Sequence, residues 1–138
     1  MARVLGVDPG SRRCGIAVTD SQRTMAFPRP AMVVDDELFA TLMALIDEES
    51  IDLVVVGHPV ALSGSETAST EAADNFFRAL GEKISPVPMV QWDERLTTYE
   101  AQKSLSDAGM KAKSHRTRVD SAAAVIMLQN YIDALSSD

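Results

Sequence analysis

The apolar run over residues 51–56 limits the fold of this chain more than any other segment. It ends in Leu-Val-Val-Val without interruption, and such a run is typical of a strand buried on both faces of a parallel sheet. Apolar residues at helical spacing precede it over residues 37–46, and a second helix is expected after it, ending near Gly81. A strand between two helices predicts an α/β fold, in which we expect this run to be the central strand.

Three further apolar runs predict an antiparallel meander at the N-terminus. Residues 4–7 and 14–19 lie on either side of a short Gly- and Arg-containing turn, and residues 31–34 follow them. Pro28 and Pro30 immediately precede the third run. Because proline cannot donate to a strand ladder, this entry should be irregular or lie at a sheet edge.

The C-terminal third is predicted to hold one more strand and two helices. Residues 87–92 have strand character, and Thr97 and Glu100 stand in capping-box spacing, so a helix should begin there. Residues 118–135 form a last helix. The expected order is therefore β-β-β-α-β-α-β-α-α, which gives a five-stranded mixed sheet with helices on both faces.

Composition narrows the classes of protein further. Residues 1–138 have the length of one domain, and 46% hydrophobic with 24% charged residues is typical of a globular chain. No apolar run approaches the roughly 20 residues of a membrane span. An acid at position 8 comes too early for a signal peptide, and Cys14 is the single cysteine. We therefore expect a cytoplasmic location and no membrane partner.

The charge distribution is uneven along the chain. Taken alone, the net charge of −7 argues against a nucleic-acid-binding protein, because phosphate contact needs a basic surface. Fifteen of the twenty acids, however, lie within residues 31–110. Two basic clusters stand outside that range: Arg12 with Arg13, and the bases of residues 111–118. Either cluster is suited to phosphate contact, and either is equally explained as a solvated loop.

Acidic residues follow the ends of the strands that should lie parallel. Asp8 ends the first strand, and Asp93 and Glu94 end the fifth. Ligands of open α/β sheets bind beyond the carboxyl ends of such strands, and carboxylates gathered there favour a bound cation. Side chains alternate along a strand, so only one of Asp93 and Glu94 should face the site. Taken singly, Asp8 also suits a turn before Pro-Gly, and Asp120 suits the first turn of a helix.

Four segments resemble the YqgF (RuvX) family, bacterial proteins with an RNase H-like fold that are related to Holliday-junction resolvases. They are VLGVDPGSRRCGIAVTD (Val4–Asp20), VVVGHPVALSGS (Val54–Ser65), WDERLTT (Trp92–Thr98) and VDSAAAVIMLQNYI (Val119–Ile132). His58 departs from the family, which usually has an apolar residue before this proline.

The resemblance implies a metal-dependent nuclease, a hydrolase of phosphodiester bonds. Its acidic set, both catalytic and metal-binding, corresponds here to Asp8, Glu94 and Asp120, with Asp93 as the alternative ligand on the fifth strand. Mg²⁺ or Mn²⁺ suits such oxygen ligands, and two ions are expected, with Asp8 bridging them.

The same segments imply contacts to nucleic acid. Arg95 stands beside the acids, where it either contacts substrate or forms a structural ion pair. The expected nucleic-acid-binding residues are Ser11, Arg12, Arg13, Arg95, Arg116 and Arg118.

For the substrate, the family suggests the 5′ end of the 16S rRNA precursor, which makes pre-16S rRNA the expected partner. Branched DNA is the alternative, as the substrate of a Holliday-junction resolvase, which would need two active sites and hence a symmetric homodimer. The sequence leaves RNA and DNA open. A non-catalytic nucleic-acid-binding factor would not need the acids, and an actin-like ATPase would need a second domain.

Overall fold

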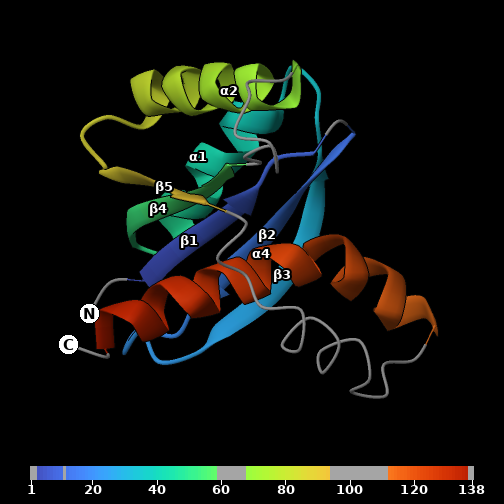
Figure 1. Ribbon diagram of the computed structural model, residues 1–138, viewed down its shortest axis with the longest axis vertical. Coiled ribbons are helices and arrows are strands. Elements are labelled where there is room, and N and C mark those ends of the chain that lie inside the picture. Colours follow the sequence, from blue (N-terminus) through green and yellow to red (C-terminus); the bar gives the residue numbers. More distant parts are fainter. Residues whose placement is uncertain (1–2, 11, 59–67, 94–111, 137–138) are drawn as a thin grey trace.

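The computed structural model describes residues 3–10, 12–58, 68–93 and 112–136, and of residues 68–70, 93, 112–120 and 136 the backbone alone. Its elements are β1 (Arg3–Asp8), β2 (Arg13–Thr19), β3 (Ala26–Val33), α1 (Leu38–Glu48), β4 (Ile51–His58), α2 (Ala68–Ile84), β5 (Met89–Asp93) and α4 (Ala112–Ser136) (Figure 1). Their order agrees with the prediction. The helix expected to begin at Thr97 lies outside the described residues.

The five strands form one mixed sheet in the order β3-β2-β1-β4-β5. β1 pairs antiparallel with β2, and β2 with β3, which confirms the predicted meander. β1, β4 and β5 run parallel, also as predicted. The central strand is β1 rather than β4, so that prediction was wrong. Both strands are paired on both sides and buried on both faces, so the apolar run could not distinguish them.

The third strand begins earlier than its sequence pattern indicated. β3 starts at Ala26, before both prolines, instead of at residue 31. Its predicted edge position is confirmed. Pro28 and Pro30 are two residues apart, so their backbone nitrogens point the same way. On an edge strand that direction can be the unpaired side, where a missing N–H costs no ladder bond.

The helices cover opposite faces of the sheet, with α1 and α2 on one face and α4 on the other (Figure 1). Leu5 and Val7 of β1 belong to the core beneath α1 and α2, whereas Val4 belongs to the core beneath α4. Gly6 also faces α4, since a Cβ built on it would lie 3.1 Å from the Leu128 Cβ. Even-numbered positions of β1 therefore face α4.

Two helix boundaries differ from the predictions. α4 begins at Ala112 rather than residue 118, and α2 continues past Gly81 to Ile84. Gly81 is a site of close packing and not a helix stop, because a Cβ there would lie 3.3 Å from the Met89 sulfur of β5.

Gly6 and Gly81 should respond differently to an added methyl group. In Gly6→Ala the methyl meets Leu128, a fully buried side chain, so we expect a loss of about 1–3 kcal/mol in the free energy of unfolding. In Gly81→Ala the methyl meets the flexible end of Met89, and removal of a helix-interior glycine should offset the contact, with a gain of up to about 1 kcal/mol. Urea unfolding measures both. A Gly6→Ala variant as stable as the wild type would contradict the close packing of α4 on β1.

Candidate active site at the carboxyl edge of the parallel strands

The carboxyl ends of the three parallel strands lie along one edge of the sheet. Val7 pairs with Val56, and His58 at the end of β4 pairs with Asp93 at the end of β5. Asp8 therefore ends β1 at the same edge. This juxtaposition of strand ends was predicted from the sequence.

Asp8 lies on the α4 side of that edge. Asp8 is two positions after Gly6, which faces α4, and next to Val7, which faces α1 and α2. Because side chains alternate along a strand, Asp8 shares the face of Gly6. The residue is half-buried. Its carboxylate is thus the acidic group of β1 that helix α4 covers.

Helix α4 runs antiparallel to β1. Near its C-terminal end, Gln129 Oε1 accepts from the Ala26 N–H at 2.9 Å, and Ala26 pairs with Thr19 beside the start of β1. Toward its N-terminal end, Ser121 Oγ accepts from the Ile16 N–H at 3.1 Å, and Ile16 pairs with Val7. The backbone that precedes Ser121, including Asp120, therefore leads to the edge where Asp8 lies.

The side chains of β5 alternate between the two helical layers. Trp92 contacts Tyr131 of α4 edge-on, with ring centroids 5.3 Å apart. Gln91 Nε2 donates to Asp74 of α2 at 3.2 Å.

The structure describes only part of the predicted site. Within the described residues no group of three His, Cys, Asp or Glu side chains is placed to hold a metal ion, and Asp8 is the one member of the acidic set with a described side chain. Arg12 and Arg13 are exposed beside the turn that joins β1 and β2, and the Arg12 carbonyl accepts from the Val34 N–H at 2.8 Å. Ser11, Glu94 and Arg95 lie outside the described residues, and Asp120, Arg116 and Arg118 are described by their α4 backbone alone.

Cys14 is fully buried in β2, as expected of a strand residue. Burial raises the pKa of its thiol to about 11, and the negative charge of Asp8 adds to the rise. The thiol therefore stays protonated at neutral pH. A protonated thiol is a poor metal ligand.

Sequence reasoning missed a polar cluster on the α2 side of the same edge. His58 Nε2 lies 3.0 Å from Asp74 Oδ1, which also accepts from Gln91. The Gln91 hydrogen bond lowers the pKa of the Asp74 carboxyl, and His58 and Arg78 lower it further. The departure of His58 from the family pattern was the one available signal, and it did not identify a partner sixteen residues away.

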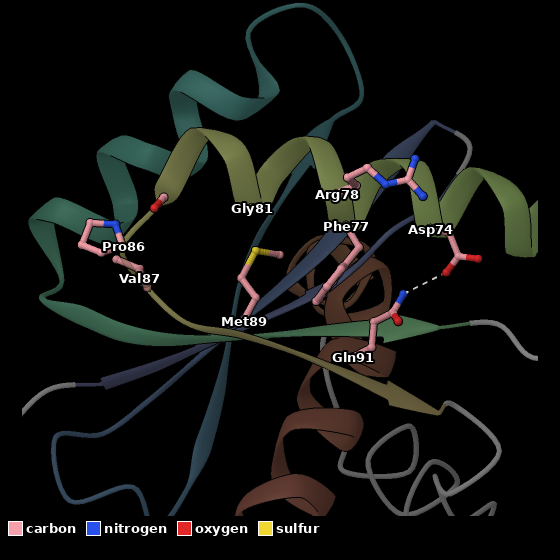
Figure 2. Close-up of a pocket in the computed structure, with 9 residues that line it drawn as sticks. Asp74, Phe77, Arg78, Gly81, Pro86, Val87, Met89 and Gln91 are labelled. Carbon is pink, nitrogen blue, oxygen red and sulfur yellow. Dashed lines mark hydrogen bonds between the residues drawn. The ribbon is translucent and has the colours of Figure 1, made fainter.

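An open groove of about 550 Å³ runs beside this cluster, between α2 and β5. Figure 2 shows Asp74 and Gln91 at one end, Phe77 and Met89 along the middle, and Pro86 and Val87 at the other end. The groove lies on the sheet face opposite to Asp8, so it is separate from the candidate active site.

Comparison with known proteins identifies the family. Residues 2–134 match RuvX, described as Holliday junction resolvase. The chain belongs to the RuvX family. Curated relatives carry the name "Putative pre-16S rRNA nuclease". One from Nitratidesulfovibrio vulgaris is 36% identical over 95% of this chain and 93% of its own length, and one from Mycobacteroides abscessus is 40% identical over 95% and 81%.

Solved structures share the fold of this RuvX chain. RuvC of T. thermophilus in complex with a Holliday junction substrate superposes with a TM-score of 0.65, at 12% identity over 99% of this chain and 97% of that one. The fowlpox virus resolvase in complex with Holliday junction DNA superposes with a TM-score of 0.57, at 10% identity over 96% of this chain and 98% of the resolvase chain. The predicted RNase H-like α/β fold is thereby confirmed. Among the described helices, none is long and apolar enough to cross a membrane.

The Asp74 cluster predicts a pH dependence of stability. A lowered folded-state pKa adds stability above the unfolded value of about 3.9, and this contribution is lost as the pH falls through the folded value. Asp74→Asn should therefore lose less stability than the wild type between about pH 5 and pH 3. Thermal unfolding at both pH values tests this, with Asp47→Asn, at an exposed position of α1, as the control for charge. An identical pH response in Asp74→Asn and wild type would contradict the prediction.

Proposed function

We propose that this RuvX protein is a metal-dependent endonuclease that hydrolyses phosphodiester bonds in structured RNA, with the 5′ end of the 16S rRNA precursor as its substrate. The observation that carries the proposal is the position of Asp8. It ends the central strand at the carboxyl edge, on the side that α4 covers. The preceding residue, Val7, pairs with Ile16, whose N–H donates to Ser121 of α4, and this supports placing Asp120 in the same site.

Asp8, Glu94 and Asp120 form the proposed catalytic set. The alternation in β5 supports Glu94 over Asp93, because position 94 has the parity of Trp92, which contacts α4. Position 93 has the parity of Gln91, which faces α2. The set combines Asp8 at the end of β1 with Glu94, the residue that follows β5 in the chain, and Asp120 of α4.

The donor types fit a hard divalent cation. All three side chains offer carboxylate oxygens, the ligands that Mg²⁺ and Mn²⁺ prefer, and the buried thiol of Cys14 does not compete. When bound, two such ions would supply an activated water and charge stabilisation for the leaving oxygen. The role proposed for this chain is to gather the carboxylates of Asp8, Glu94 and Asp120, whose mutual repulsion favours binding of cations that would also contact the substrate phosphate.

Basic residues around this edge are proposed to bind the nucleic acid. Arg12 and Arg13 are exposed beside the hairpin turn that follows Asp8. We assign the same role to Ser11, Arg95, Arg116 and Arg118. The names of the relatives support RNA as the substrate.

Four-way DNA is the second candidate, because the family description is Holliday junction resolvase. The deciding experiment incubates the protein with labelled 16S precursor RNA and with a four-way DNA junction, each with EDTA, Mg²⁺ or Mn²⁺. Cleavage of the RNA alone supports the proposal. Symmetric cleavage of the junction by a homodimer would instead identify the protein as a Holliday-junction resolvase. Binding of the RNA or the junction without cleavage would indicate a non-catalytic binding factor.

Substitution of the acidic set should abolish cleavage with little loss of fold. Asp8→Asn, Glu94→Gln and Asp120→Asn should each reduce the cleavage rate on the order of a hundredfold or more, since an amide binds Mg²⁺ weakly and does not neutralise it. Asp93→Asn is the matched control and should have a much smaller effect. Single-turnover cleavage measures all four variants. An inactive Asp93→Asn beside an active Glu94→Gln would reverse the assignment on β5.

Removal of the hairpin arginines should weaken binding in a salt-dependent way. The chain carries a net charge of −7, so affinity must come from local positive clusters. The Arg12→Ala, Arg13→Ala double variant should bind more weakly, and the slope of log affinity against log salt should fall by about one for each lost phosphate contact. Arg23→Ala, in the turn between β2 and β3 at the opposite end of the sheet, is the control. An unchanged slope would place the substrate elsewhere.

A further inference from the structure

Ser121 of α4 is a fully buried polar side chain within an otherwise apolar helix face. Its Oγ donates to the Arg29 carbonyl of β3 at 2.6 Å and accepts from the Ile16 N–H of β2 at 3.1 Å. Ile16 and Arg29 are partners in the β2–β3 register, and that register shifts between Cys14 and Ile16. The hydroxyl thus joins the helix to both strands at the irregular point of their ladder.

A short backbone path through this contact links the positions of Asp8 and Asp120 in the chain. Ile16 pairs with Val7, and the next pair along the two strands is Gly15 with Asp8. On the helix, Ser121 directly follows Asp120. The hydroxyl therefore fixes the backbone next to Asp120 against the backbone next to Asp8.

We propose that Ser121 is a positioning residue for the metal-binding carboxylates, an inference that rests on the proposed function. Without its two hydrogen bonds, the α4 backbone at Asp120 would be held less firmly relative to the strand backbone beside Asp8, and we expect the carboxylates to bind a cation more weakly. Removal of a group that hydrogen-bonds directly to a metal ligand typically changes metal affinity by 10–100-fold; Ser121 acts through the backbone instead, so the lower end of that range is expected.

A purely structural role for Ser121 makes a different prediction. If the hydroxyl only satisfies the interrupted β2–β3 ladder, its loss should lower stability and leave metal binding unchanged. Gln129 offers a matched comparison two helical turns away on the same helix. It also joins α4 to two backbone groups, accepting from the Ala26 N–H at 2.9 Å and donating to the Thr24 carbonyl at 3.1 Å, but at the end of the sheet opposite to Asp8.

The experiment measures Mg²⁺ and Mn²⁺ binding to the full-length protein in the absence of nucleic acid. Calorimetric titration and the metal-induced rise in melting temperature are compared for the wild type, Ser121→Ala, Ser121→Thr and Gln129→Ala. We expect Ser121→Ala to bind metal at least tenfold more weakly. Ser121→Thr, which keeps the hydroxyl, and Gln129→Ala should stay within about threefold of the wild type, even where their melting temperatures are lower.

The outcomes separate this inference from the proposed function. Metal binding by Ser121→Ala equal to that of the wild type would overturn the positioning role alone. A loss in Gln129→Ala as large as in Ser121→Ala would also overturn it, because the effect would then follow general helix docking. If Ser121→Ala does not fold, the threonine variant decides, and a tenfold loss there overturns the role of the hydroxyl. A wild type that binds neither ion, or binds it equally well as Asp8→Asn, would overturn the proposed metal site itself.

Discussion

The close contact between α4 and the central strand is the constraint on which the arrangement of the site depends. A helix normally stands off a sheet by the thickness of two layers of side chains, but Gly6 contributes none, and Leu128 occupies the space above it. The α4 backbone is consequently brought near β1, since the Ala124 carbonyl would lie only 3.5 Å from a Cβ on Gly6. Asp8 is two positions further along β1 on the same face, so it also lies on the side that α4 approaches.

The two faces of the sheet hold their helices by different kinds of contact. Beneath α1 and α2 lies the larger apolar core, which includes Leu5, Val54 and Leu80. The α4 face holds a core of fewer buried residues, together with hydrogen bonds from Ser121 and Gln129 to the strand backbones. The apolar face stabilises the sheet, whereas hydrogen bonds on the other face specify where along the sheet the helix lies. These hydrogen bonds also define the position of a carboxylate on α4, because apolar packing by itself would tolerate small translations of the helix.

The charged and polar groups at the carboxyl edge also differ between the two faces of the sheet. On the α2 side, Asp74 is already compensated by hydrogen bonds from Gln91 and by His58 and Arg78. On the α4 side, Asp8 is half-buried at the end of β1, and burial, to which the charge of Asp8 adds, raises the pKa of the Cys14 thiol on the neighbouring strand to about 11. Among the described residues, this edge therefore has a hydrogen-bonded polar cluster on its α2 side and the carboxylate of Asp8 on its α4 side.

The sequence by itself determined the strand and helix order, the meander, the parallel pairing and the carboxyl-edge position of Asp8. These depend on local periodicity and on chain connectivity, both of which can be read from one chain. Tertiary structure decided that β1 rather than β4 is central, that β3 extends through two prolines, and that Gly81 is a packing position. It also decided the partners of His58 and Ser121, which lie 16 and 105 residues away along the chain. Such pairings depend on which surfaces meet after the sheet has formed, and a side chain's own sequence neighbourhood carries no record of them.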